Sequence, residues 1–220
     1  MPYLIIIFCF ISSGIFAQSN LGETSDPEAI AILKKIKADY DKYDAHKLEF
    51  DLQIELAGQG SETQSGYLIQ SGEKLVLNTG QQQIMSDGET VWVYLKDIEE
   101  IQINDADFSE DEGFMSPSTV FEMYNSNEFI FALGNTVSEN GKSFQEVEAK
   151  PTDRYSEYAK FRITLDEKNK SITKMMIFSK DGSRYTLNIT AHRKGIEVET
   201  STFVMDTNKY PDAHVEDLRF

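Results

Sequence analysis

The segment LEFDLQIEL, Leu48–Leu56, alternates apolar and polar side chains without interruption. Successive side chains of an extended strand point to opposite faces, so its apolar side chains share one face and its acidic side chains share the other. A strand with one buried and one solvated face is typical of antiparallel sheets. The segment therefore predicts a mainly β protein whose core lies on one side of a sheet.

Further strand candidates lie on both sides of turn signals, of which DG at 87–88, NG at 140–141 and DG at 181–182 favour two-residue hairpins. The candidates are GYLIQ (66–70), EKLVLN (73–78), QQQIMS (81–86), VWVYL (91–95), IEEIQIND (98–105), FIFAL (129–133), SFQEVEA (143–149), KFRITLD (160–166), ITKMMIFS (172–179), RYTLNITAH (184–192) and the region 196–204. They predict one domain built on a curved sheet of about 11 antiparallel strands in a sequential meander.

Two segments show helical spacing instead. In DPEAIAILKKIKADYDKY (26–43), Asp26 is a good N-cap and Pro27 suits the first helical position. SPSTVFEMYN (116–125) predicts a shorter helix that begins near a proline. The apolar faces of the two helices hold Ile30, Leu33, Ile36, Tyr40 and Tyr43 in the first, and Val120, Phe121 and Tyr124 in the second.

The first residues, MPYLIIIFCFISSGIFAQ, contain an apolar run that is short for a membrane span and is followed by small and then polar residues. This pattern predicts a signal peptide over 1–17, cleaved after Ala17, then a flexible lead over 18–25 and a domain over 26–220. The alternative is a retained N-terminal anchor. Cys9, the only cysteine, would leave with the signal, and export without disulfides favours the bacterial periplasm.

Charge excludes one class of partner. The chain has 37 acidic and 21 basic residues, a formal net charge of −16, so nucleic acids and anionic lipid surfaces repel it. The acidic segment 105–112 lacks the ligand and glycine pattern of an EF-hand loop and predicts a solvated loop.

The sequence offers no catalytic constellation. His46, His192 and His214 stand in unrelated contexts without zinc-ligand spacing, which favours surface or turn positions, and no GxSxG elbow, P-loop or dinucleotide fingerprint occurs. We therefore expect no enzyme activity, no catalytic residue, no metal site and no cofactor.

Two strands hold more apolar residues than a half-solvated sheet needs. VWVYL is apolar on both faces, and KMMIFS (174–179) has a similar two-sided character. Burial on both faces is one explanation. The other is that one face packs while the opposite face lines a cavity for an apolar ligand beneath the helices.

The order of these elements resembles the LolA-type outer-membrane lipoprotein carrier proteins. The resemblance rests on the DPEA-type helix, the alternating strand, GYLI (66–69), SDGETVWVY (86–94) and the closing segment KYPDAHVEDLR (209–219). It implies an unclosed antiparallel half β-barrel with an α-helical lid that encloses a hydrophobic cavity. It also implies a carrier that takes acylated lipoproteins from a LolCDE-type inner-membrane transporter towards the outer membrane, and we expect a monomer.

On this reading ten residues are candidates to line the lipid-binding cavity. They are Trp92, Tyr94, Leu52, Ile54, Leu75, Ile30, Leu33, Ile36, Phe121 and Tyr124. Trp92 is the first of them. Which strand face looks inward stays open, because a slip of one residue in register exchanges the faces.

The chain departs from the family pattern at one point. Members often carry an Arg-Pro pair after the G-x-L strand, whereas this chain has Gly72 and Glu73 there. The lid latch and a LolB-type acceptor are therefore left open. A regulatory module on the same fold that senses lipid or lipoprotein is the main alternative to a carrier, and a hydrolase or a purely structural envelope protein are the others.

Overall fold

The computed structural model describes residues 24–106, 117–124, 126–139 and 141–219. The predicted signal peptide, most of the predicted lead and the acidic residues 107–112 lie outside these ranges. The elements are α1 (Pro27–Tyr40), β1 (His46–Glu55), β2 (Ser61–Ser71), β3 (Lys74–Asn78), β4 (Gln82–Ser86), β5 (Thr90–Leu95), β6 (Glu100–Asp105), α2 (Pro117–Met123), β7 (Phe129–Glu139), β8 (Lys142–Pro151), β9 (Tyr158–Asp166), β10 (Ser171–Ser179), β11 (Arg184–Lys194), the 3₁₀ helices η2 (Thr200–Phe203) and η3 (Thr207–Lys209), and β12 (His214–Asp217).

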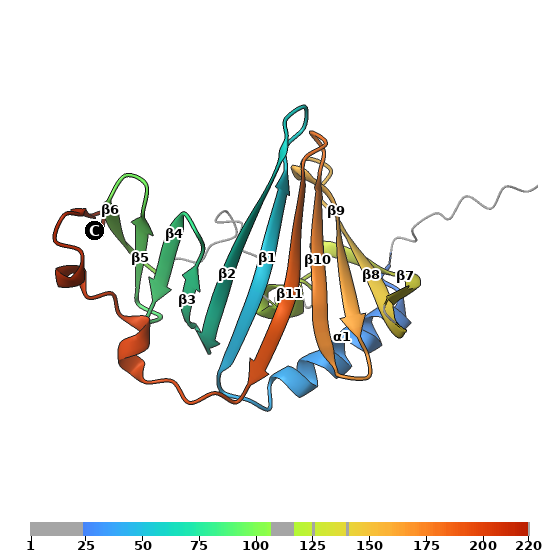
Figure 1. Ribbon diagram of the computed structural model, residues 1–220. Helices are drawn as coiled ribbons and strands as arrows, with labels where there is room; N and C mark the ends of the chain where they lie inside the picture. Colours follow the sequence, from blue (N-terminus) through green and yellow to red (C-terminus); the bar gives the residue numbers. More distant parts are fainter. Residues whose placement is uncertain (1–23, 107–116, 125, 140, 220) are drawn as a thin grey trace, which may run out of the picture.

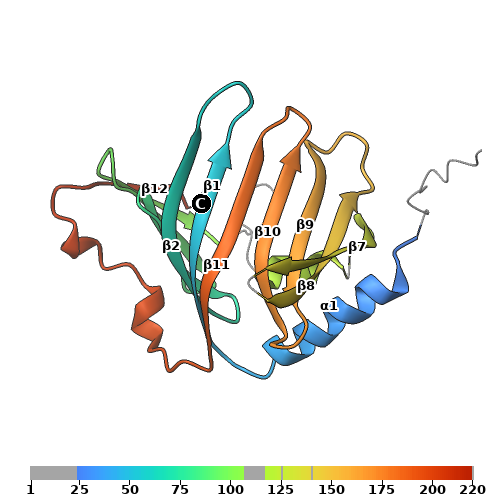
Figure 2. The same ribbon diagram turned by 45° about the vertical axis from the view of Figure 1, so that its right-hand side comes forward.

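The strands form one sheet in the order β12-β6-β5-β4-β3-β2-β1-β11-β10-β9-β8-β7. The sheet is strongly curved and does not close (Figure 1, Figure 2). Two antiparallel meanders, β1–β6 and β7–β11, meet where β1 pairs with β11. The mainly β architecture with an unclosed sheet is confirmed.

Three details of the predicted sheet were wrong. The chain does not form a single sequential meander, because β1 and β11 are far apart in sequence. The region 196–204 is not a strand: it contains the 3₁₀ helix η2 and crosses the sheet. A twelfth strand, β12, pairs in parallel with β6 within the predicted closing segment.

Local chemistry explains where α1 begins. The side chain of Asp26 accepts a hydrogen bond from the Glu28 N–H at 2.8 Å, and Pro27 occupies the first turn, where an N–H would lack a helical partner. At its other end the Asp41 N–H bonds to the Lys37 carbonyl at 2.8 Å. The prediction of this helix and its cap is confirmed.

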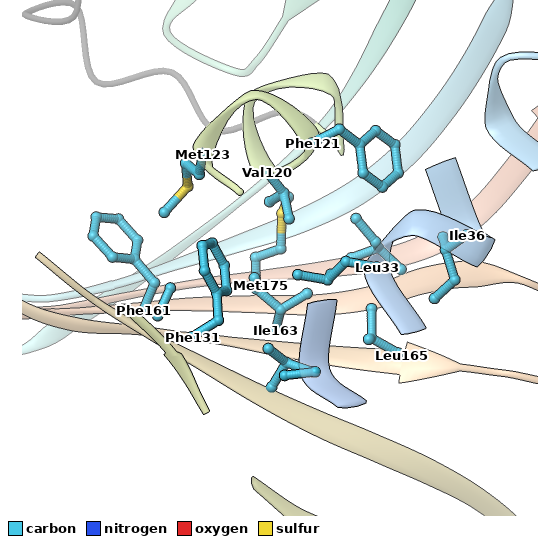
Figure 3. Close-up of a cluster of buried hydrophobic side chains, with 14 residues drawn as sticks. Leu33, Ile36, Val120, Phe121, Met123, Phe131, Phe161, Ile163, Leu165 and Met175 are labelled. Carbon is cyan, nitrogen blue, oxygen red and sulfur yellow. The ribbon is translucent and has the colours of Figure 1, made fainter. Parts of the chain in front are cut away.

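Both helices pack on the same face of the sheet, which we call the inner face; the opposite face is the outer face. Leu33 and Ile36 of α1 and Val120 of α2 are fully or almost fully buried there. Figure 3 shows them converging with Ile163 and Met175 of the sheet. The buried members of this core are Ala29, Leu33, Ile36, Val120, Phe121, Met123, Phe131, Val147, Ala149, Phe161, Ile163, Leu165, Ile172 and Met175.

Candidate functional site

The cross-strand residue pairs show which side chains lie on the inner face in both meanders. Leu48 on β1 is paired with Leu68 on β2, and Leu68 with Leu77 on β3. On the other side of β1, Leu52 is paired with Leu187 on β11, which is paired with Met175 on β10. Because Met175 belongs to the core beneath the helices, all of these side chains lie on the helix-covered face.

The helices cover only part of this face. Beyond them, towards the β1–β2 and β10–β11 turns at the top of Figure 1, lies a cavity of about 760 Å³. A volume of this size is in the range of known ligand-binding cavities. It is lined by Phe50, Leu52, Ile54, Gln64, Leu77, Thr79, Gln81, Gln82, Ile84, Glu157, Tyr158, Met175, Ile177, Ser179, Lys180, Asp181, Tyr185 and Leu187.

The lining is divided by chemistry. The side chains from β1, β10 and β11 that look into the cavity are mostly aliphatic or aromatic, such as Ile54, Ile177 and Tyr185. Polar residues come chiefly from loops and strand ends, such as Gln81 and Asp181. Met175 lines the cavity and also packs in the helix-covered core, so the two regions are continuous. An apolar guest is favoured over a charged one.

The structure brings eight of the ten predicted residues to the inner face, in three positions. Leu52 and Ile54 line the cavity. Leu75 packs beside it against the cluster that contains Phe50 and Leu77. The remaining five belong to the helices and pack on or within the core beneath them: Ile30, Leu33, Ile36, Phe121 and Tyr124.

Trp92 and Tyr94 lie elsewhere. Trp92 is paired with Met85, which is paired with Val76, and this row is on the outer face. There Trp92 is buried beneath Phe203 and Met205 of the C-terminal segment, residues 196–213, which crosses this half of the sheet. The expectation that Trp92 and Tyr94 share one face is confirmed, but that face is opposite to the one that carries Leu52. Register decides this, and a register cannot be read from one strand.

Sequence reasoning left several cavity residues out of the candidate set. Phe50 continues the alternation of Leu52 and Ile54, so the same pattern could have included it. Ile177 and Met175 lie in the two-sided segment KMMIFS, whose inner half they form. Tyr158 gave no signal, because only the pairing of β9 with β10 brings it to the cavity.

A polar network under the helices was also missed. His46 is 2% exposed, and its Nδ1 lies 3.1 Å from Nε2 of His192, so these two histidines are not surface residues in unrelated contexts. Nε2 of His46 is 3.1 Å from the Tyr43 carbonyl, which can only accept. When both rings are neutral, His46 therefore donates to Tyr43 and accepts from His192.

The same network joins both helices to β2. The Tyr40 ring at the end of α1 stacks on His46 with 3.6 Å between ring centroids, and its hydroxyl donates to Gln70 Oε1 at 3.3 Å. Gln70 Nε2 in turn donates to Ser118 Oγ of α2 at 2.9 Å. Gly72 and Glu73, at the departure from the family pattern, form the exposed turn that follows β2.

Burial sets the protonation of this network. Burial, with the nearby His46 and Lys194, lowers the pKa of His192 to about 4. Burial also lowers the pKa of His46, although the hydrogen bond to Tyr43 opposes the shift. Both rings are thus held neutral at pH 7.

Among the described residues, no group of three or more His, Cys, Asp or Glu side chains is arranged to hold a metal ion. No helix in the described part of the chain is long and apolar enough to cross a membrane.

Several solved structures are similar to this chain in fold. Among solved structures, an uncharacterized conserved protein from Thermus thermophilus is 10% identical, with a TM-score of 0.57 over 86% of this chain and 99% of that chain. A putative outer membrane lipoprotein-sorting protein domain from Vibrio parahaemolyticus is 14% identical, with a TM-score of 0.46 over 83% of this chain and 98% of that one. A LolA superfamily protein from Nitrosomonas europaea is 13% identical, with a TM-score of 0.43 over 81% and 98%.

Curated protein sequences give no match to the chain. The sequence model described as outer membrane lipoprotein carrier protein LolA matches residues 52–206, which include the last part of β1, all of β2–β11 and α2. The protein belongs to the LolA family of outer-membrane lipoprotein carrier proteins.

Proposed function

We propose that the protein is a periplasmic carrier that shelters the acyl chains of lipoproteins in the inner-face cavity and carries them from the inner membrane towards the outer membrane. The observation that carries this proposal is the cavity of about 760 Å³, whose apolar lining comes from both meanders. Family membership supports the same conclusion.

The mechanism is reversible burial and needs no bond to be made or broken. Moving each CH₂ of an acyl chain from water to an apolar surface stabilises the complex by roughly 0.8 kcal/mol. An acylated protein therefore leaves a membrane for water only when another apolar shelter is at hand. Phe50, Leu52, Ile54 and Ile177 provide such a surface.

The helices give the cavity a means to expand. Met175 lies at the border between the cavity and the helix-covered core, so a shift of α1 and α2 away from the sheet would extend the apolar surface beyond it. Apart from their chain connections, the helices are held on the sheet by apolar packing and a few hydrogen bonds, which such a movement would have to break. The helices then act as the lid, and Leu33, Ile36 and Phe121 become contacts of the cargo only after that movement.

The formal charge of −16 suits a partner with a basic docking surface. We propose that a LolCDE-type transporter at the inner membrane supplies the cargo and that electrostatic attraction speeds the encounter. Association with the transporter should weaken as salt rises, and an association rate that is equal at low and high salt would exclude steering.

The direct test is to isolate the protein from the cell envelope and identify its bound molecules by mass spectrometry. Acylated proteins support the carrier. Free phospholipid alone would favour a lipid-sensing module, and an empty protein that also fails to bind a triacylated peptide would overturn the proposal.

A matched pair of variants on β10 tests the cavity itself. Ile177 lines the cavity, whereas its neighbour Met176 points to the outer face, next to Arg162 of β9 and Thr186 of β11. Ile177→Glu places a charge in the apolar lining and should weaken binding of a fluorescent triacylated peptide roughly tenfold or more.

Met176→Glu is the control, because both side chains are half-buried on the same strand. It should bind the peptide like the wild type. Equal losses in the two variants, with the fold intact by circular dichroism, would contradict the proposed position of the acyl chains.

A further inference from the structure

The sheet splits along β2. β2 is paired with β1 from Ser61 to Gln70, but it is paired with β3 only from Tyr67 to Ser71. In the described part of the chain, no strand pairs with Ser61–Gly66 on the side of β3. Every second residue of an antiparallel strand directs its N–H and C=O towards a given side, so this segment presents unpaired main-chain groups to the gap.

The split between β2 and β3 begins at Gly66. A Cβ atom at Gly66 would lie 2.5 Å from the Asn78 carbonyl oxygen and 2.8 Å from Cζ of Phe50, so the strands make their last close approach there. Beyond this point the β3–β4 turn is bound to another strand end. Lys96 Nζ donates to Asn78 Oδ1 at 3.0 Å and to the Thr79 carbonyl. These bonds tie the turn to the end of β5.

The gap borders two hollows. On the inner side is the apolar cavity, and on the outer side is an open groove of about 650 Å³. Phe50 and Thr79 line both, while Gln64 lines the cavity and Ser65 lines the groove. A molecule held in the cavity can therefore leave it along the free edge of β2.

The other sheet edges are better protected. The Asp26 N–H donates to the Phe131 carbonyl of β7 at 2.7 Å, and Ser25 Oγ accepts from the Phe131 N–H at 3.1 Å. The edge of β6 is covered by β12, which is short and carries Glu216 and Asp217. By contrast, Ser61–Gly66 holds no lysine or proline that would prevent strand addition.

We propose that Ser61–Gly66 binds the polypeptide segment that follows the acylated N-terminus of the cargo, which adds to β2 as an extended strand while its acyl chains lie in the cavity. This inference rests on the proposed carrier function, because it is the burial of the acyl chains that brings the peptide to this edge. Strand addition recognises main-chain groups, and the side chains of Ser61, Thr63 and Gln64 are polar. One carrier can therefore hold lipoproteins of unrelated sequence.

A side-chain hydrogen bond crosses the gap, in which Gln81 Nε2 donates to Glu62 Oε1 at 3.1 Å. It marks two positions at which the gap can be closed. Glu62→Cys and Gln81→Cys are introduced together after Cys9, the only native cysteine, is replaced by serine. A short bis-maleimide with a reducible centre then bridges the two cysteines.

Two probes separate the edge from the cavity. One is a triacylated cysteine amide, and the other carries the same lipid on a peptide of about ten residues. Before bridging, the longer probe should bind roughly tenfold more tightly, since a few main-chain hydrogen bonds suffice for that difference. Bridging should remove this advantage without changing the affinity of the short probe, and reduction should restore it.

Hydrogen exchange gives the second readout. Those amides of Ser61–Gly66 that point into the gap should be protected by the long probe and not by the short one. Equal affinity for both probes before bridging, or a long-probe advantage that survives bridging, would overturn the edge proposal while the carrier function stands. If neither probe binds the unbridged protein, the carrier function itself fails.

Discussion

The two meanders of the sheet are covered on opposite faces. In the β7–β11 half, α1 and α2 bury the inner face, and the outer face carries charged side chains such as Glu148 and Arg162, joined at 2.7 Å. In the β3–β6 half, the C-terminal segment 196–213 buries the outer face around Trp92. The inner side chains Leu77 and Ile84 of that half are left to line the cavity. Because the covering segments lie on opposite faces in the two halves, an apolar part of the inner face is left uncovered where the halves meet.

This difference separates residues that stabilise the fold from residues that are placed to hold a ligand. Trp92 and Leu52 both belong to apolar strand faces. Trp92 is covered by Phe203 and Met205, whereas Leu52 lines the cavity. Substitutions in the two halves should therefore have separable effects on stability and on binding.

The largest effect is expected at Trp92. Trp92→Ala removes the centre of the outer-face cluster and should lower the free energy of unfolding by about 3–5 kcal/mol in a urea titration. The protein that remains folded should bind the triacylated peptide with unchanged affinity. A folded variant with weakened binding would place Trp92 in the binding site and break the comparison.

A smaller effect is expected where the helices are tied to the sheet. Gln70→Ala removes the bonds to Tyr40 and Ser118 and should lower the free energy of unfolding by about 1–3 kcal/mol. It should also speed hydrogen exchange in α2 while leaving that of β5 and β6 unchanged. Gln83→Ala, which removes the Tyr210 bond on the outer face, is the matched control and should leave exchange in α2 unaltered.

The smallest effect is a pH dependence of the free energy of unfolding that comes from the histidine pair beneath the helices. The pKa of His192 falls from its ordinary value of 6.5 to about 4 in the folded protein, and that of His46 is lowered too. The unfolded chain therefore binds more protons as pH drops, so stability present above pH 6.5 is lost as pH falls towards 4. A second proton would also set two cations against each other across 3.1 Å.

Urea titrations between pH 7 and pH 4 measure this loss. In His192→Gln the decline should be shallower than in the wild type, whereas His214→Gln, at an exposed position of β12, should follow the wild type. Acidic residues also titrate towards the lower end, so the difference between the variants is the quantity to compare. Identical curves for His192→Gln and the wild type would exclude the histidine pair as its source.

Local patterns were enough to predict most elements of the fold. Asp26 and Pro27 marked the start of α1, and the DG pair at 181–182 marked a hairpin in which Gly182 has a φ of 94°. Alternation in LEFDLQIEL placed Phe50, Leu52 and Ile54 on one face, which is the face that lines the cavity. These signals depend on neighbours in the chain, so one sequence contains them.

The region 196–204 shows where such signals fail. It was predicted to be a strand, but its apolar residues Val198 and Phe203 pack across β3–β6 as part of an irregular segment. Apolar content predicts that a segment is buried without saying which surface it covers. The prediction that His46 and His192 are unrelated surface residues was wrong for a similar reason. The two side chains meet only because β1 pairs with β11.

The sequence by itself determined that the chain is a mainly β protein with amphipathic helices, because strand and helix periods are local properties of side-chain order. The tertiary structure alone decided that VWVYL turns Trp92 away from the cavity, that β2 keeps a free edge and that Gln70 joins both helices. Each of these depends on how strands pair with one another or on what packs against the sheet, which no single segment contains. A shift of one residue would exchange the two faces while leaving every local pattern intact.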